Sequence, residues 1–519
     1  MSHRRKTIEE EHDVLATTHH NLSAVQEEME DLNELTSATH REQPPSLTEE
    51  EEEPVTSPPP PPAAAAAADG KSKKSEIDIS LRIHEKVASL ASKAYRKASA
   101  KSNVLCKDKI SGVALVKFED ITVGQLLGKG SFSYVHEITK ISSGAASHEA
   151  EDDDGDSNDY PVMHANRDQE DHRAFLVANA ERRESKSFRY AVKFLKDDVR
   201  SNPKAYAIGT VDLVVEGMFL ASLTHPNIIK VRALPEGGVR SLVQPNARGY
   251  FLVLDRLYDT LSERIYNTWQ EQHHVEMAMA SSSGCLCLSF GKKNNQANEE
   301  ERRHLEERLK VAFDISAALK FLHSKSIIYR DIKPENLGFD VRGDIKLFDL
   351  GLVKELHPND RKRDGNYKLS MAGTPRYMAP ECGKHLRYNL SADVYSFSML
   401  LWEIVTMTQP LDDFTYPRLQ KEVFEDGYRP PLTAVTNKSM RDLIRVGWHQ
   451  DASKRPSMDT VYEELKKEFQ ILHGVKMSEK ELSHDRRRST HVPSRLANVN
   501  VSTLLRLSSD GNLGSVPNR

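Results

Sequence analysis

Two neighbouring segments constrain this chain more than any other part of its sequence. Residues 328–337 read IYRDIKPENL and residues 345–351 read IKLFDLG, so each places charged or amide side chains beside short apolar runs. Asp331 can accept a proton from a hydroxyl group. The side-chain oxygens of Asn336 and Asp349 are of the kind that Mg²⁺ prefers as ligands. The segments therefore predict a site where magnesium and a proton acceptor lie close together.

Lys333 lies two positions after Asp331 and can neutralise a γ-phosphate group while it is transferred. Phosphoryl transfer needs charge neutralisation and in-line positioning more than covalent help, which matches this set of residues. A purely structural interpretation makes Asp331 and Asn336 turn residues and Asp349 the end of a strand.

A lysine interrupts the apolar run at residues 190–195, which reads YAVKFL and predicts a buried strand. Because a buried amine is not kept unpaired, Lys193 needs an acidic partner. Glu216, on a helix predicted over residues 211–223, is the predicted partner. The pair could simply tie the helix to the sheet, or its ammonium group could meet the phosphates of a nucleotide. The structural interpretation of residues 328–351 gives no reason for this pair.

A glycine pair lies between two predicted strands, at residues 121–127 and 134–139. Gly128 and Gly130 lack a Cβ atom, so the backbone N–H groups around them can approach phosphate oxygens. On its own this pattern also fits an ordinary hairpin turn. Upstream of Lys193, it predicts a phosphate-binding loop.

In this order, these motifs resemble those of the eukaryotic protein kinase family over residues 118–473. The resemblance implies an α+β fold with two lobes, a small β-rich N-lobe with one main helix and a larger, mostly helical C-lobe. It implies ATP and Mg²⁺ as cofactors between the lobes, with Lys193 on the third strand, Leu254 as gatekeeper and Asp255 to Leu257 as the adenine-binding hinge. The residues implied to be catalytic are Asp331, Lys333, Lys193 and Glu216, and the implied magnesium ligands are Asn336 and Asp349. The residues implied to bind the nucleotide are Leu127, Gly128, Lys129, Gly130, Ser131, Phe132, Ser133, Val135, Ala191, Lys193, Leu254, Asp255 and Leu257.

The resemblance also covers the C-terminal part of the region. Ala379-Pro380-Glu381 closes the implied activation segment, and Arg455 is the implied partner of Glu381. Asp393 matches another family position, and all three sites have an implied structural role. Lys333 and residues 373–377, which read GTPRY, resemble serine/threonine kinases, and residues 393–404 resemble the tyrosine-kinase-like group of those enzymes.

Three positions depart from the family pattern. Ser133 replaces a glycine, Tyr329 replaces the usual histidine, and Leu350 replaces the usual phenylalanine. None of these changes removes a proton acceptor, a magnesium ligand or the phosphate-binding lysine. The alternative function, a catalytically inactive pseudokinase that acts as a scaffold, is therefore disfavoured.

Regulation is predicted from Arg330, because an arginine directly before the predicted catalytic aspartate can pair with a phosphate group. Ser370 lies where the family usually carries an activating phosphate, and Thr374 is a further predicted regulatory residue. An upstream kinase acting on this segment is the implied partner. The alternative interpretation of Ser370 is a solvated loop serine.

The chain has 519 residues, of which only 38% are apolar, so polar segments must accompany an ordinary core. The predicted organisation is a disordered region at 1–115 with short helices near 7–36 and 77–100, a kinase domain at 116–473, and a disordered tail at 474–519. The prolines and alanines at 58–68 are interpreted as linker. Insertions near 142–187 and 268–298 are interpreted as surface loops.

A net charge of −5 does not favour nucleic-acid binding. Four cysteines do not form a disulfide framework, and no apolar run reaches the length of a membrane span, so we expect a cytoplasmic protein, with the nucleus as an additional location. The expected partners are protein substrates. An approximate heptad at residues 8–32 predicts either weak self-association or a solvated, partly helical tail.

Overall fold

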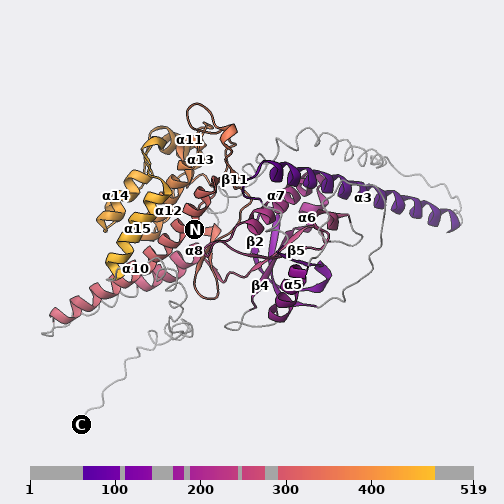
Figure 1. Ribbon diagram of the computed structural model, residues 1–519, viewed down its shortest axis with the longest axis horizontal. Helices are drawn as coiled ribbons and strands as arrows, with labels where there is room; N and C mark the ends of the chain where they lie inside the picture. Colours follow the sequence, from indigo (N-terminus) through magenta and orange to yellow (C-terminus); the bar gives the residue numbers. More distant parts are fainter. Residues whose placement is uncertain are drawn as a thin grey trace, which may run out of the picture.

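The computed structural model of the chain describes residues 62–105, 112–142, 167–180, 188–243, 248–274 and 290–473. Figure 1 shows these residues as two bodies, a lobe built on a β-sheet and a lobe built mainly from helices. This arrangement confirms the predicted two-lobed α+β fold. The predicted helix near residues 7–36 and the predicted tail at 474–519 lie outside the described residues.

The N-lobe contains a six-stranded sheet with the order β1-β5-β6-β4-β3-β2. All neighbouring pairs are antiparallel except β1 and β5, which are parallel. The strands are β1 (Ala114–Val116), β2 (Ile121–Lys129), β3 (Ser133–Ile141), β4 (Tyr190–Leu195), β5 (Val231–Pro235) and β6 (Phe251–Asp255), and 3-10 turns occur at η2 (Phe118–Asp120) and η3 (Gly238–Leu242).

The main helix of the N-lobe is α7 (Pro203–Ser222), which follows the short helix α6 (Asp197–Ser201). Asn202 starts α7 because its side chain accepts a hydrogen bond from the N–H of Ala205, and Pro203 suits the first helical position. Among the described helices, α7 is long and apolar enough to cross a membrane by composition alone, but most of it is buried inside the protein. It is a core helix of the lobe.

The C-lobe is organised around α10 (Phe290–Ser324), which packs against α12 (Ser391–Thr406) and α15 (Met458–His473). Its other helical elements are α8 (Leu261–Glu263), the π-helical η4 (Arg264–Trp269), α11 (Pro380–Gly383), α13 (Tyr416–Arg418), the π-helical η7 (Leu419–Glu425) and α14 (Lys438–Gly447), with 3-10 turns at η5 (Pro334–Asn336), η6 (Pro358–Asp360), η8 (Leu432–Ala434) and η9 (Ala452–Lys454). Five short strands form two small sheets, β10-β9-β7 and β11-β8. They are β7 (Asp259–Thr260), β8 (Ile327–Ile328), β9 (Leu337–Phe339), β10 (Ile345–Leu347) and β11 (Lys354–Glu355).

Helix α3 (Pro62–Lys101) covers the predicted helix near 77–100 and begins much earlier. The interpretation of residues 62–68 as linker therefore differs from the structure, because an alanine run favours a helix over a coil. The strand β1 begins at Ala114, within the segment predicted to be disordered. It adds a strand at the edge of the sheet, so Lys193 lies on the fourth strand in chain order and not on the third.

The two insertions also differ from the predicted loops. Within residues 142–187 the structure has a helix, α5 (Arg167–Ala180), which packs against β1 and β3 and buries Leu176 and Ala180. Within residues 268–298 the chain is helical up to residue 274, and α10 begins at Phe290. Part of the polar composition that suggested loops belongs to exposed side chains of α5, and part belongs to residues outside the described ranges.

Candidate active site

The glycine segment connects β2 to β3 and lies beside the strand that carries Lys193. Gly130 N–H donates to the Ser133 carbonyl at 2.9 Å, which closes the turn. The Lys196 side chain donates to the Ser131 carbonyl at 2.8 Å and so fixes the tip of the loop. In the β3–β4 register Val135 is paired with Lys193. The structure therefore brings the predicted loop, residues 127–135, next to the predicted phosphate-binding lysine.

Lys193, Glu216 and Asp349 form one charged cluster between β4, α7 and the C-lobe. The Lys193 Nζ atom lies 2.9 Å and 2.7 Å from the two carboxylate oxygens of Glu216 and 3.5 Å from Asp349 Oδ1. Glu216 is almost fully buried, whereas 47% of the Asp349 side chain is exposed. The cluster therefore leaves the Asp349 carboxylate accessible to a ligand.

Lys193 and Asp349 stabilise each other's charge, whereas burial raises the pKa of Glu216 above its ordinary value. Burial lowers the pKa of Lys193, but Asp349 and Glu216 outweigh burial and hold that pKa above its ordinary value. Lys193 in turn holds the pKa of Asp349 below its usual range, against the effect of burial. Asp349 is thus an anion and Lys193 a cation at neutral pH, as a metal ligand and a phosphate-binding group must be.

Asp331 lies after β8 and is held by its neighbours on the loop that follows. Asn336 Nδ2 donates to Asp331 Oδ2 at 2.7 Å, and the Lys333 Nζ atom lies 3.4 Å from the same oxygen. The second oxygen, Oδ1, accepts from the N–H and the hydroxyl of Thr374 at 2.9 and 2.8 Å. Because Asn336 donates through its nitrogen, its Oδ1 remains available as a ligand for a cation. The residues present therefore fit a magnesium ion between Asn336 and Asp349.

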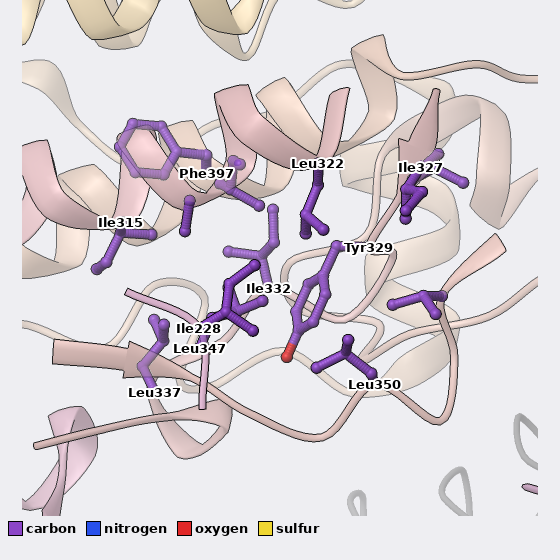
Figure 2. Close-up of a cluster of buried hydrophobic side chains, with 14 of the residues drawn as sticks. Ile228, Ile315, Leu322, Ile327, Tyr329, Ile332, Leu337, Leu347, Leu350 and Phe397 are labelled. Atoms are coloured by element: carbon purple, nitrogen blue, oxygen red, sulfur yellow. The ribbon is translucent and has the colours of Figure 1, made fainter. Parts of the chain in front are cut away.

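Tyr329 and Leu350, two departures from the family pattern, pack together under this site (Figure 2). Both are buried, and the Tyr329 hydroxyl donates to the Phe348 carbonyl, next to Asp349. The N–H groups of Tyr329 and Arg330 donate to the buried carboxylate of Asp393, at 2.7 and 2.8 Å. Asp393 therefore fixes the backbone that leads to Asp331, which agrees with the structural role that the resemblance implies.

The predicted hinge joins β6 to the C-lobe. Leu254 is paired with Ala191 on β4, so the two residues lie directly opposite each other in neighbouring strands. Asp255 is held by two hydrogen bonds from Arg232, at 2.7 and 2.9 Å. The Leu257 side chain lies against Gly338, where an added Cβ atom would be 2.8 Å from Leu257 Cδ1. The structure thus brings the predicted adenine-binding residues together at the C-terminal end of β6, where the chain leaves the sheet for the C-lobe.

The predicted regulatory residues Arg330, Ser370 and Thr374 lie close to Asp331 or to Tyr388. The Arg330 side chain is buried; its Nε donates to the Leu352 carbonyl at 2.7 Å, and its Nη1 and Nη2 atoms have no hydrogen-bond partner in the described part of the chain. The Tyr388 hydroxyl donates to the Ser370 carbonyl at 2.6 Å. Burial raises the pKa of Tyr388 to about 12, and the nearby charge of Arg330 opposes this shift. Tyr388 therefore contacts the Ser370 backbone and is also close enough to Arg330 to be affected by its charge.

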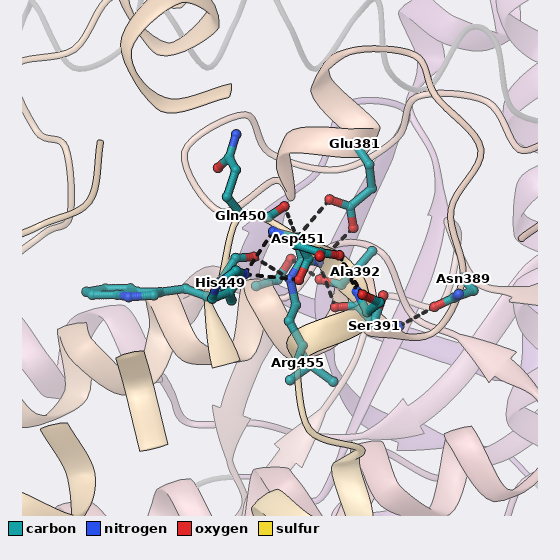
Figure 3. Close-up of polar contacts among 12 residues, drawn as sticks. Glu381, Asn389, Ser391, Ala392, His449, Gln450, Asp451 and Arg455 are labelled. Atoms are coloured by element: carbon teal, nitrogen blue, oxygen red, sulfur yellow. Dashed lines mark hydrogen bonds and ion pairs between the residues drawn. The ribbon is translucent and has the colours of Figure 1, made fainter. Parts of the chain in front are cut away.

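Arg455 and Glu381 join the end of the activation segment to the C-lobe (Figure 3). Two parallel hydrogen bonds of 2.7 and 2.8 Å connect the guanidinium to the carboxylate, and the Arg455 side chain is fully buried. The predicted pairing of these two residues is therefore present in the structure.

Sequence reasoning missed three contacts of the site. Thr374 was assigned to regulation, yet it donates two hydrogen bonds to Asp331. Lys196 and Arg232 were not singled out, although they fix the glycine loop and the hinge. Lys196 directly follows the buried strand that carries Lys193, but no sequence signal pairs Arg232 with Asp255.

A family model described as protein tyrosine and serine/threonine kinase matches residues 173–465, which is more than half of the chain. Serine/threonine/tyrosine-protein kinase HT1 of Arabidopsis thaliana is 35% identical over 186 residues, which cover 36% of this chain and 45% of that protein. Serine/threonine-protein kinase STY17 of Arabidopsis thaliana is 32% identical over 157 residues, which cover 30% and 26%. Dual specificity protein kinase shkB of Dictyostelium discoideum is 32% identical over 167 residues, which cover 32% and 25%. The aligned region therefore spans less than half of each of these relatives.

Proposed function

The chain belongs to the protein tyrosine and serine/threonine kinase family, and on this premise we propose that it transfers the γ-phosphoryl group of ATP to serine or threonine hydroxyls of proteins. The observation that carries the proposal is the convergence of Lys193, Glu216 and Asp349 in one cluster, beside the glycine segment. A pair that only tied α7 to the sheet would need Glu216 alone, whereas Lys193 also lies 3.5 Å from the half-exposed carboxylate of Asp349, which supports a role in binding nucleotide.

Each residue of the site has a role in the proposed reaction. Lys193, oriented by Glu216, binds nucleotide phosphates, and Asp331 orients the substrate hydroxyl and accepts its proton. Lys333 neutralises the charge of the group being transferred. Asn336 and Asp349 would hold magnesium, which when bound supplies charge neutralisation at the phosphate oxygens.

The preference for serine and threonine rests on Lys333 and on the segment that includes Thr374. Lys333 lies beside Asp331, where it contacts the oxygen opposite to the one that Thr374 binds. Of the relatives named above, STY17 is named a serine/threonine kinase, HT1 a serine/threonine/tyrosine kinase and shkB a dual specificity kinase. We assign this chain to the tyrosine-kinase-like group on its sequence motifs, and we place it in the cytoplasm on its cysteine content.

Transfer of labelled phosphate from magnesium-ATP to a library of serine, threonine and tyrosine peptides tests the proposal. Wild type is expected to label serine and threonine peptides, and Asp331→Asn is expected to lose roughly 10²-fold or more of the rate. Asp412→Asn, on an exposed loop, is the matched control and should retain the wild-type rate. Nucleotide binding without any transfer would instead support the inactive pseudokinase, and labelling confined to tyrosine would reject the assignment.

A further inference from the structure

Helix α3 lies along α7, on the side of that helix away from the sheet (Figure 1). Val87, Ala88 and Ala91 of α3 are fully buried, as expected for side chains in a close-packed interior. The His84 ring also packs edge-on against Tyr206 of α7, with ring centroids 5.3 Å apart. The N-terminal helix is therefore part of the core that holds α7, which carries Glu216.

The end of α3 has a defined structure. After Lys101 the chain turns, and the Ser102 Oγ atom accepts the N–H groups of Val104 and Leu105 at 3.0 and 2.8 Å. The side chains of Val104 and Leu105 are buried. The turn is thus fixed by hydrogen bonds to the Ser102 side chain and by the packing of the two apolar side chains.

This turn contacts a buried carboxylate of the C-lobe. The Ser102 hydroxyl donates to Glu355 Oε2, and the N–H of Asn103 donates to Glu355 Oε1 at 2.8 Å. Glu355 is only 7% exposed. Within the described part of the chain, the basic side chain within 4 Å of its carboxylate is His357, whose Nδ1 atom lies 3.9 Å from Glu355 Oε1. A buried carboxylate without donors is strongly unfavourable, so Ser102 and Asn103 stabilise it in its present place.

Glu355 occupies a position from which the active site can be controlled. It lies on β11, the strand that follows Asp349, and it is paired with Ile327 on β8. β8 continues directly into Tyr329, Arg330 and Asp331. A shift of Glu355 would therefore move both the segment that carries the magnesium ligand and the segment that carries the proton acceptor.

We propose that Ser102 is a positioning residue for phosphoryl transfer, acting through Glu355. The group formed by Ser102, Asn103 and Glu355, here called the α3 latch, ties α7 and the β8–β11 pair into one active arrangement. Opening the α3 latch would release β11 and loosen the helix that carries Glu216. The kinetic part of this proposal rests on the proposed kinase activity, whereas the coupling between α3 and β11 does not.

The test compares three variants of the full chain: Ser102→Ala, Ser102→Thr and the control Ser201→Ala. Ser201 is an exposed serine whose hydroxyl, among the described residues, donates to the Asp197 and Asp198 carbonyls of its own helix. Steady-state kinetics gives kcat and the KM for ATP, and amide hydrogen exchange followed by mass spectrometry reports on β11, α7 and the remote helix α14.

The expected result for Ser102→Ala is a fall in kcat of about tenfold, with the KM for ATP changed less than threefold, because a hydrogen bond to a charged group is lost. Ser102→Thr, which keeps the hydroxyl, should stay within twofold of wild type. Exchange should rise in β11 and α7 of the alanine variant but not in α14. The proposal is overturned if Ser102→Ala exchanges at β11 like Ser201→Ala. This comparison of hydrogen exchange tests the α3 latch even if the wild type transfers no phosphate. A result against the α3 latch can therefore be distinguished from a result against the kinase assignment.

Discussion

At Gly373 a single methyl group would disturb the active site directly. The residue has φ of +104°, and a Cβ atom there would lie 2.2 Å from the Arg330 carbonyl oxygen. Gly373→Ala therefore combines backbone strain with a clash against the backbone that leads to Asp331. We expect overpacking to lower the free energy of unfolding by about 1 to 3 kcal/mol beyond the strain itself, and kcat to fall roughly 10²-fold.

Gly343 supplies the matched control for this variant. It also has a positive φ, +78°, but no atom lies within 4 Å of an added Cβ. Gly343→Ala should lose about 1 to 2 kcal/mol from strain alone and keep its kcat. Urea unfolding and steady-state kinetics on both variants measure the difference, and equal activities would show that the contact between Gly373 and Arg330 is not needed.

The buried carboxyl group of Glu403 is expected to make the free energy of unfolding depend on pH. It lies fully buried on α12 and accepts hydrogen bonds from the hydroxyls of Tyr266 and Tyr377. Burial raises the pKa of Glu403 to about 8 from its ordinary 4.5, although both tyrosines oppose the shift. Between these two values the folded protein holds a proton that the unfolded chain has lost, so stability falls as the pH rises through this window.

The corresponding variant is Glu403→Gln, which cannot ionise. Between pH 5 and pH 8.5 the wild type should lose about 1 to 3 kcal/mol more stability than this variant. Urea unfolding at the two pH values gives the comparison. Parallel pH profiles for the two proteins would mean that Glu403 ionises normally in the fold.

The contacts of a single residue could be predicted from sequence where its side chain requires a particular kind of partner. Lys193 and Glu216 were paired from sequence because a lysine inside a buried strand requires a counter-charge. The contact of Thr374 with Asp331 could not be found in the same way. Both residues are compatible with solvent, and only the path of the chain between them brings them together.

Among the elements, the activation segment carries the regulatory prediction. The Tyr388 hydroxyl donates to the Ser370 carbonyl, and the charge of Arg330 acts on Tyr388; the Nη1 and Nη2 atoms of Arg330 have no hydrogen-bond partner among the described residues. A phosphate on Ser370 could form new charge-assisted hydrogen bonds with Arg330. We expect phosphatase treatment to slow the phosphorylated wild type roughly tenfold and to leave Ser370→Ala unchanged. Equal rates for wild type before and after treatment, with phosphate removal verified by mass spectrometry, would contradict this role.

Elements were predictable where their pattern is local. The strand that carries Lys193 follows from an apolar run, whereas the helix predicted over residues 211–223 begins earlier, at Pro203, where Asn202 caps it. Helix α5 was missed because its polar composition resembles a loop, and only its packing against β1 and β3 gives it a buried face. The same holds for β1, which is three residues long and is defined by its pairing with β5.

At the scale of the whole molecule, contacts between the lobes beyond the hinge and the Lys193–Asp349 ion pair help to set the site. The segment before β5 is bonded to β10, where Asn227 Nδ2 donates to the Ile345 carbonyl at 3.0 Å and Ile229 N–H donates to Leu347 at 2.9 Å. The α3 latch forms another of these contacts, through Glu355. The glycine segment precedes the part of the chain that matches the family model, yet the pairing of β3 with β4 returns it to Lys193.

The central claim is that Lys193 and Asp349, from opposite lobes, act on one magnesium-bound ATP. Single-turnover transfer from labelled ATP by wild type, Lys193→Met, Asp349→Asn and the double variant tests it most directly. Each single variant should be slowed roughly 10²- to 10³-fold, and the double variant should be no more than about tenfold slower than the slower single one, because both residues serve the same transition state. Either single variant retaining more than about a tenth of the wild-type rate would contradict the account.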